Sequence, residues 1–138
     1  MKKSTIREVT FKLIYSMEIQ KDYEEEDIEL FLENMEIQEE QAKEQIKEDI
    51  KNIKINNNEI IEQITNNLKS DWRLERISKV NISLLKLALY EMLYKNVPYK
   101  VVINEIVELA KKYGEDTSSS FINGVLATVV KQKGLGVE

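Results

Sequence analysis

The segment from about Asn81 to Lys95 constrains the fold more than any other part of the chain. As an α-helix it has apolar residues over most of its circumference and only a narrow polar sector. A helix that is apolar almost all round is buried, so we expect this one at the centre of the molecule. Its apolar residues are Ile82, Leu84, Leu85, Leu87, Ala88, Leu89, Met92 and Leu93.

The rest of the chain also has a helical apolar period, and no strand-like alternation persists. Four glycines and one proline in 138 residues leave few loop breakers, which favours long helices. The pattern therefore predicts an all-α fold. The predicted helices are about Thr5–Gln20, one from near Asp27, about Gln38–Lys54, one carrying Ile60 to Leu68, about Asn81–Lys95, about Tyr99–Tyr113, and one from the 116–120 segment through about Lys131.

Capping and glycine rules make several local predictions. Ser4 and Asn81 are predicted N-caps, since their side chains can accept from the first free backbone amides. Gly114 is predicted to end its helix in the left-handed conformation. Gly124, inside the last helix, is expected where another backbone comes close. The tail at 134–136 is expected to fray.

The absence of certain residue types limits the catalytic and metal-binding chemistry that the chain can perform. Without cysteine or histidine the chain has no thiolate nucleophile, no imidazole base and no Cys- or His-ligated metal. The four glycines are scattered and form no phosphate-binding loop. We therefore expect no enzyme activity, no metal and no cofactor.

Charge is distributed unevenly along the chain. Residues 1–17 carry a net charge of +3, whereas fourteen acids against three lysines give residues 18–49 a net charge of −11. A nucleic acid should therefore approach the first helix, and a protein this acidic should need a basic partner to hold RNA tightly. No signal peptide and no membrane-spanning run is visible, so a cytoplasmic location is expected.

The first predicted helix has a second stripe opposite its aliphatic one. Arg7, Phe11 and Tyr15 lie there at spacings of four, with Lys12 nearby. Interleaved basic and aromatic side chains are typical of single-stranded RNA sites, in which rings stack on bases and cations meet phosphates. The alternative is that the two aromatic residues pack on a neighbouring helix. The helical wheel leaves both interpretations open.

Two interpretations are also open for the polar sector of the central helix. Lys86, Tyr90 and Tyr94 occupy its only polar sector, which either faces a partner or is the wet edge of a core helix. Glu91 lies toward the apolar side and needs a cation if it is buried, for which Arg73 and Arg76 are candidates. Phe121, on the last helix, sits at the edge of the apolar stripe, where pattern alone favours a core role.

Three groups of residues make the chain recognisable. Together they resemble the NusB family and occur in the family's order. The first group is Asp71-Trp72-Arg73-Leu74-Glu75-Arg76-Ile77 with the segment 84–91, the second is 97–105 with 108–111, and the third is 121–126. The resemblance spans the chain but is strong only from about residue 71 to 126. It implies a single NusB-like domain over 1–138 of about seven helices in two packed bundles, with halves of about 1–70 and 71–133.

The resemblance also implies a function. Members of this family bind boxA RNA of ribosomal RNA leader transcripts jointly with the ribosomal protein NusE, and the complex joins RNA polymerase and suppresses premature termination. Carried over by position, the implied RNA-binding residues are Lys2, Lys3, Arg7, Tyr15 and Phe121. The implied partner-binding residues are Asn81, Lys86 and Tyr90.

This sequence departs from the family pattern at charged positions. Family members often have several arginines where Lys3, Ser4 and Thr5 stand, an acid at the position of Asn81, and a cation at that of Ser120. The loss of charge leaves open a helical interaction module or homodimer without RNA activity. A NusB-like domain in front of an RNA cytosine methyltransferase is a further alternative, disfavoured by the missing cofactor-binding domain and nucleophilic cysteine.

Overall fold

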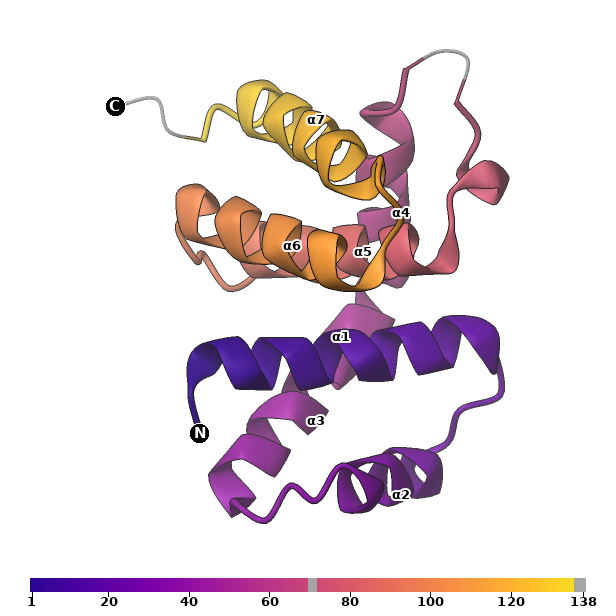
Figure 1. Ribbon diagram of the computed structural model, residues 1–138, viewed down its shortest axis with the longest axis vertical. Coiled ribbons are helices and arrows are strands. Elements are labelled where there is room, and N and C mark those ends of the chain that lie inside the picture. The colour runs from indigo at the N-terminus through magenta and orange to yellow at the C-terminus, as the bar shows by residue number, and fades with distance from the viewer. Residues whose placement is uncertain (70–71, 136–138) are drawn as a thin grey trace.

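The computed structural model describes residues 1–69 and 72–135 (Figure 1). The described residues form seven α-helices and one short 3₁₀ helix, and they contain no strand, so the prediction of an all-α fold is confirmed. The elements are α1 (Lys3–Ile19), α2 (Glu25–Asn34), α3 (Glu40–Ile55), α4 (Asn57–Asn66), η1 (Leu74–Arg76), α5 (Lys79–Leu93), α6 (Tyr99–Tyr113) and α7 (Ser118–Gln132).

Helix α5 is the centre of the molecule, as the sequence predicts. Every residue from Ile82 to Met92 is buried. Helices α1, α4, α6 and α7 all pack against it, so the apolar residues around its whole circumference find a neighbour. The central helix therefore holds the fold together.

The other helices form layers on either side of α5 (Figure 1). α6 and α7 pack on each other and on α5, while α1 lies on another side of α5 and also contacts α3. α2 lies at the end of the molecule farthest from α7. α4 packs mainly on α5, although the predicted boundary near residue 70 assigned it to the N-terminal half. That division into halves stays a prediction.

The predicted N-caps of α1 and α5 are wrong. Helix α1 begins one residue before Ser4, with Lys2 as its N-cap. Helix α5 begins at Lys79, because the Ser78 side chain accepts a hydrogen bond from the backbone N–H of Asn81 at 3.1 Å. Ser78 therefore supplies the cap that was predicted for Asn81.

The prediction that Gly114 is left-handed is also wrong. Gly114 has a φ of −94°, so it is not left-handed. A Cβ there would lie 2.8 Å from the Ala110 carbonyl oxygen, so lack of space explains the glycine. The tail does not fray at once: Gly134, with a φ of +68°, turns the chain so that Leu135 donates its N–H to Val130 at 3.0 Å and packs on the core. Gly136 lies outside the described residues.

Gly124 contradicts its prediction as well, since an added Cβ would meet no atom within 4 Å. We expect Gly124→Ala to raise the free energy of unfolding by about 0.5–1 kcal/mol, because alanine loses less backbone entropy than glycine in an exposed helix position. Urea unfolding followed by circular dichroism measures this. A destabilised variant would show that a close approach at Gly124 had been missed.

No helix among the described residues is long and apolar enough to cross a bilayer.

Candidate nucleic-acid interface

Arg7 is held in a nearly buried ion pair. Its Nε donates to both carboxylate oxygens of Glu91 at 3.1 and 2.8 Å, and its Nη2 donates to Glu91 Oε1 at 2.7 Å. Its Nη1 lies 3.5 Å from Glu105 Oε1. The side chains of Arg7 and Glu91 are only 9% and 7% exposed. This bidentate ion pair joins α1 to α5, and Glu105 adds a contact to α6.

The ion pair corrects one prediction and limits another. The buried Glu91 is neutralised by Arg7, so the candidates Arg73 and Arg76, which are both exposed, were wrong. Hydrogen bonding to Glu91 raises the pKa of Arg7. Because two carboxylates surround this one guanidinium, the group carries net negative charge and attracts phosphate poorly. An RNA contact by Arg7 stays a prediction, beside the structural role that the geometry gives it.

A cluster of aromatic and lysine side chains lies where α1 meets the end of α6. Phe11 is buried and its ring centroid lies 5.2 Å from that of Tyr113, so the packing interpretation of Phe11 is confirmed. Tyr15 stacks beside Phe11 at 6.3 Å and stays half-buried. Lys12 and Lys112 place their Nζ atoms 5.6 and 5.3 Å from the centre of the Tyr113 ring. We call these five residues the α1–α6 cluster.

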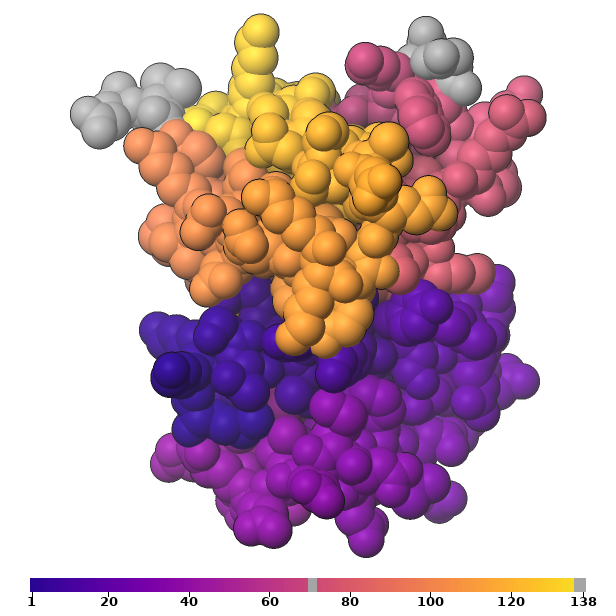
Figure 2. Space-filling view, viewed as in Figure 1, coloured from indigo at the N-terminus to yellow at the C-terminus, as the bar shows by residue number. Residues whose placement is uncertain are grey.

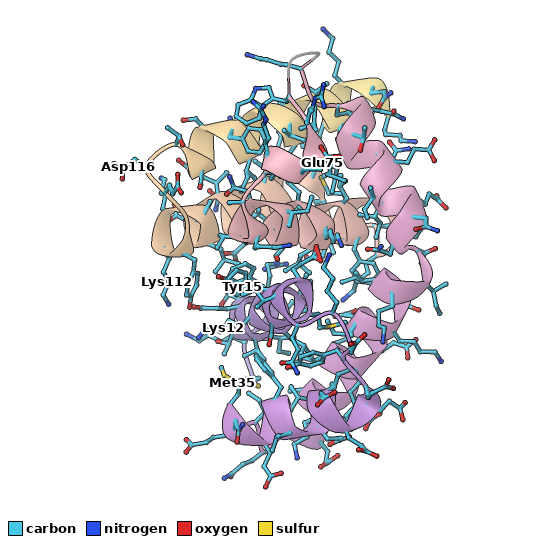
Figure 3. The ribbon with its side chains drawn as sticks, turned by 90° about the vertical axis from the view of Figure 1, so that its right-hand side faces the viewer. Lys12, Tyr15, Met35, Glu75, Lys112 and Asp116 are labelled. Carbon is cyan, nitrogen blue, oxygen red and sulfur yellow. The ribbon has the colours of Figure 1, made fainter. Side chains whose placement is uncertain are left out.

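Apart from the buried Phe11, the residues of this cluster reach the surface. In Figure 2 the orange atoms at the end of α6 lie against the indigo atoms of α1. Figure 3 shows Lys12, Tyr15 and Lys112 near one another, with Asp116, in the loop before α7, on the same side. The cluster thus combines partly exposed rings with cations, which is the pattern used to bind single-stranded RNA.

Glu8 fixes part of the α1–α6 cluster. Lys112 donates to its Oε2 at 2.7 Å, and the Tyr113 hydroxyl donates to the same oxygen. These two hydrogen bonds lower the pKa of Glu8. The interaction therefore stabilises the fold above the ordinary pKa of a glutamate and is lost as the pH falls through the lowered value.

Phe121 lies in a different groove. Its ring centroid is 5.1 Å from that of Trp72, with the two planes 39° apart, and the side chain packs on the edge of the core. Trp72 itself is 44% exposed. Phe121 is half-buried, so it is both a packing residue and an accessible one. Sequence pattern alone predicted only the packing role.

The structure does not bring Arg7 and Phe121 together. In Figure 1, α1 runs from left to right and α7 from right to left, with α6 between them. The first turns of the two helices therefore lie at opposite ends, and the two residues line separate grooves. Lys2 and Lys3 are exposed at the start of α1.

Two of the three residues predicted to bind a partner are buried. Lys86 is 7% exposed, and its Nζ lies 3.0 Å from Glu18 Oε1 on α1. Tyr90 is 3% exposed, and its hydroxyl donates to Asp49 Oδ1 on α3 at 2.9 Å. At Lys86 and Tyr90 the polar sector of α5 is therefore neither a surface window nor a wet edge, because α1 and α3 cover it. Tyr94, the third residue of the sector, is half-buried. Direct partner contacts by Lys86 and Tyr90 stay untested, and their burial argues against them.

Asn81 is half-buried in the first turn of α5. Its Oδ1 is buried and has no hydrogen-bond partner among the described residues. It is the only residue of the predicted partner set that is not buried, and the exposed residues Ser78 and Lys79 precede it closely in the chain. Its role in partner binding stays a prediction.

Sequence reasoning missed the polar contacts around Asp49. This carboxylate is 5% exposed and bonds Tyr90, while Lys95 Nζ lies 3.2 Å from its Oδ1. A signal was present: Asp49 falls between Ile46 and Ile53 at spacings of three and four, inside the apolar stripe of its helix. An acid in that register needs a partner.

Burial of Tyr90 makes a pH prediction. Burial, together with the hydrogen bond to Asp49, raises its pKa from 10.0 to about 12. The unfolded chain loses this proton near pH 10 and the folded chain does not, so stability should fall as the pH rises from 10 toward 12. In an absorbance titration at 295 nm, the difference between the wild type and Tyr90→Phe should appear near pH 12. A difference near pH 10 would contradict the buried position.

Comparison with known proteins gives one consistent result. The family model described as "NusB family" matches residues 4–131. The transcription antitermination protein NusB of Acetivibrio thermocellus is 44% identical over 92% of this chain and 87% of that protein. Among solved structures, Thermotoga maritima NusB matches with a TM-score of 0.85 at 33% identity, covering 96% of this chain and 92% of that one.

A third match concerns a complex. A chain from the crystal structure of the antitermination factors NusB and NusE with double-stranded RNA has a TM-score of 0.84 and covers 94% of this chain and 96% of its own length. Its identity is 24%, so this match supports the fold alone.

Proposed function

Because this chain belongs to the NusB family, we propose that it is a transcription antitermination factor that binds boxA RNA of ribosomal RNA leaders together with NusE. In this proposal the complex joins RNA polymerase and suppresses premature termination. The chain supplies a binding surface and performs no chemistry. A relative of the same fold was crystallised with NusE and RNA, which supports both proposed partners.

The α1–α6 cluster is the observation that carries the RNA part of the proposal. Tyr15 offers a ring for a base, and Lys12 and Lys112 offer cations for phosphates. From there the strand passes the loop before α7 and reaches Phe121, while Lys2 and Lys3 attract it at the start of α1. Arg7 holds α1 against α5 and α6, so its main effect on RNA is to position this surface.

The acidic balance explains why a partner is needed. The net charge of the chain is −5, and Lys112 is partly neutralised by Glu8. A surface with so few free cations gains little from releasing the counterions of RNA. A basic protein docked beside it supplies the missing charge, and the acidic α2–α3 side of this chain repels RNA and so restricts the strand to the other side.

Removal of two lysines tests the RNA surface. We expect Lys12→Ala with Lys112→Ala to weaken boxA RNA binding by the complex with NusE, and to reduce the slope of log affinity against log salt by about 1.4. The matched control is Lys51→Ala with Lys54→Ala, which removes two exposed lysines of α3. Equal slopes in the two variants would place the RNA elsewhere.

A further inference from the structure

We propose that Trp72, backed by Phe121, is the stacking surface of a slot for one unpaired base of the bound RNA. This inference rests on the proposed function and deepens it, since it adds Trp72 to the RNA site. The slot is a groove of about 380 Å³ between the end of α4, the segment before η1 and the first half of α7. We call it the Trp72 groove. Its lining includes Lys69, Trp72, Ser120, Phe121, Gly124 and Thr128.

The two rings have the geometry of an accessible aromatic pair. With centroids 5.1 Å apart and planes tilted by 39°, Trp72 covers one side of Phe121 while 44% of its own surface remains exposed. An exposed indole leaves apolar surface in water, which a base stacked on it would remove. Every base has a π-face, so such a slot takes any of the four.

Charge favours RNA in this groove over the others. Lys69 is the only charged residue in the described lining, and it is exposed. Four other grooves of the described residues each carry at least one carboxylate, such as Glu8, Glu18 or Glu48. Those grooves mix carboxylates with cations such as Lys86 and Lys112, whereas Lys69 has no carboxylate beside it in the described lining of the Trp72 groove. Arg73 follows Trp72 in the chain and Asp71 precedes it, so the two neighbours of Trp72 add no net charge.

Gly124 keeps the Trp72 groove open. It lies in the middle of α7, where glycine costs about 1 kcal/mol relative to alanine. No atom lies within 4 Å of the position where its Cβ would stand, so packing does not require the glycine. Free space on the groove floor is what it provides. Thr117, Ser120 and Thr128 line the same groove. The Thr128 hydroxyl already donates to the Gly124 carbonyl at 3.0 Å, so it can only accept from a base, whereas the other two hydroxyls can donate or accept.

The first test observes Trp72 directly. It is the only tryptophan of the chain, so 5-fluorotryptophan incorporated into this chain alone gives one ¹⁹F NMR signal. We expect that signal to shift when single-stranded boxA RNA is added to the complex with NusE. The same signal, unmoved at RNA saturation, would overturn the slot. A shift on adding NusE with no further change on adding RNA would also overturn it and would assign the groove to the protein partner.

The second test separates stacking from packing. Trp72→Leu keeps an apolar cover over Phe121 but has no ring, whereas Trp72→Phe keeps one. We expect Trp72→Leu to weaken RNA binding by about 5- to 150-fold, the range for loss of one base–aromatic stack. Trp72→Phe should recover most of the affinity. Gly124→Leu, which fills the groove from α7, should act like Trp72→Leu. Circular dichroism checks that each variant folds.

A double-mutant cycle between Trp72→Leu and modified RNAs identifies the base that stacks on Trp72. Abasic residues are placed one at a time along the strand, and each RNA is measured with the wild type and with Trp72→Leu. We expect the two losses to be non-additive at one position, where both remove the same stack. Additive losses at every position would overturn the slot but leave the proposed function standing. Failure of the wild-type complex to bind boxA RNA at all would overturn both.

Discussion

Replacing Arg7 by methionine should lower the free energy of unfolding by about 3–5 kcal/mol, the usual cost of removing one partner from a buried ion pair. The reason is that the buried carboxylate of Glu91, on the central helix, would lose its bidentate hydrogen-bond partner. Burial leaves this carboxylate only 7% exposed, so water cannot replace the guanidinium. Urea unfolding of the wild type and the variant measures the difference.

Two further variants make this test specific. Lys111→Met removes an exposed cation, which is 59% exposed and paired with Glu108, and should change stability by at most about 1 kcal/mol. Arg7→Met combined with Glu91→Leu should regain much of the loss, because no unpaired charge stays buried. An Arg7→Met variant of wild-type stability whose RNA complex loses salt dependence would instead make Arg7 an RNA contact, as the family resemblance implied.

Replacing Phe121 by leucine should weaken boxA RNA binding by the complex with NusE by about 5- to 150-fold while the fold is kept. Leucine preserves most of the apolar contact with the core edge but offers no ring to a base. Fluorescence polarisation of a labelled RNA measures the affinity, and the melting temperature of the free chain measures the packing. A lower melting temperature with unchanged RNA affinity would make Phe121 a core residue only.

The helices could be predicted, because the apolar pattern of each one lies within its own segment of the sequence. The period of apolar residues identified seven helices and the central position of α5, because a helix buried on all sides needs apolar residues on all sides. Helix starts were less predictable, since several Ser, Asn and Asp residues compete for each cap. Ser78, three residues before Asn81, is the residue that caps α5, because its hydroxyl oxygen accepts from the backbone N–H of Asn81.

The candidate site was harder to predict from the sequence, because its contacts join residues that are far apart in the chain. Arg7 and Glu91 are 84 positions apart, so a helical wheel could place both correctly and still miss their pairing. Lys86 and Tyr90 were assigned to a surface because nothing in the sequence of α5 indicates that α1 and α3 cover its polar sector. Trp72 was noted only as part of a family motif, and its contact with Phe121 depends on how the segment before η1 folds back on α7.

The proposed function requires that this chain and NusE bind RNA more tightly together than apart, and one titration measures this. A labelled boxA RNA is titrated with this chain alone, with NusE alone and with both, at two salt concentrations. We predict that the two proteins together bind about 5- to 150-fold more tightly than either one alone, and that added salt weakens the binding. Binding by the mixture that is no tighter than that of NusE alone would contradict the account.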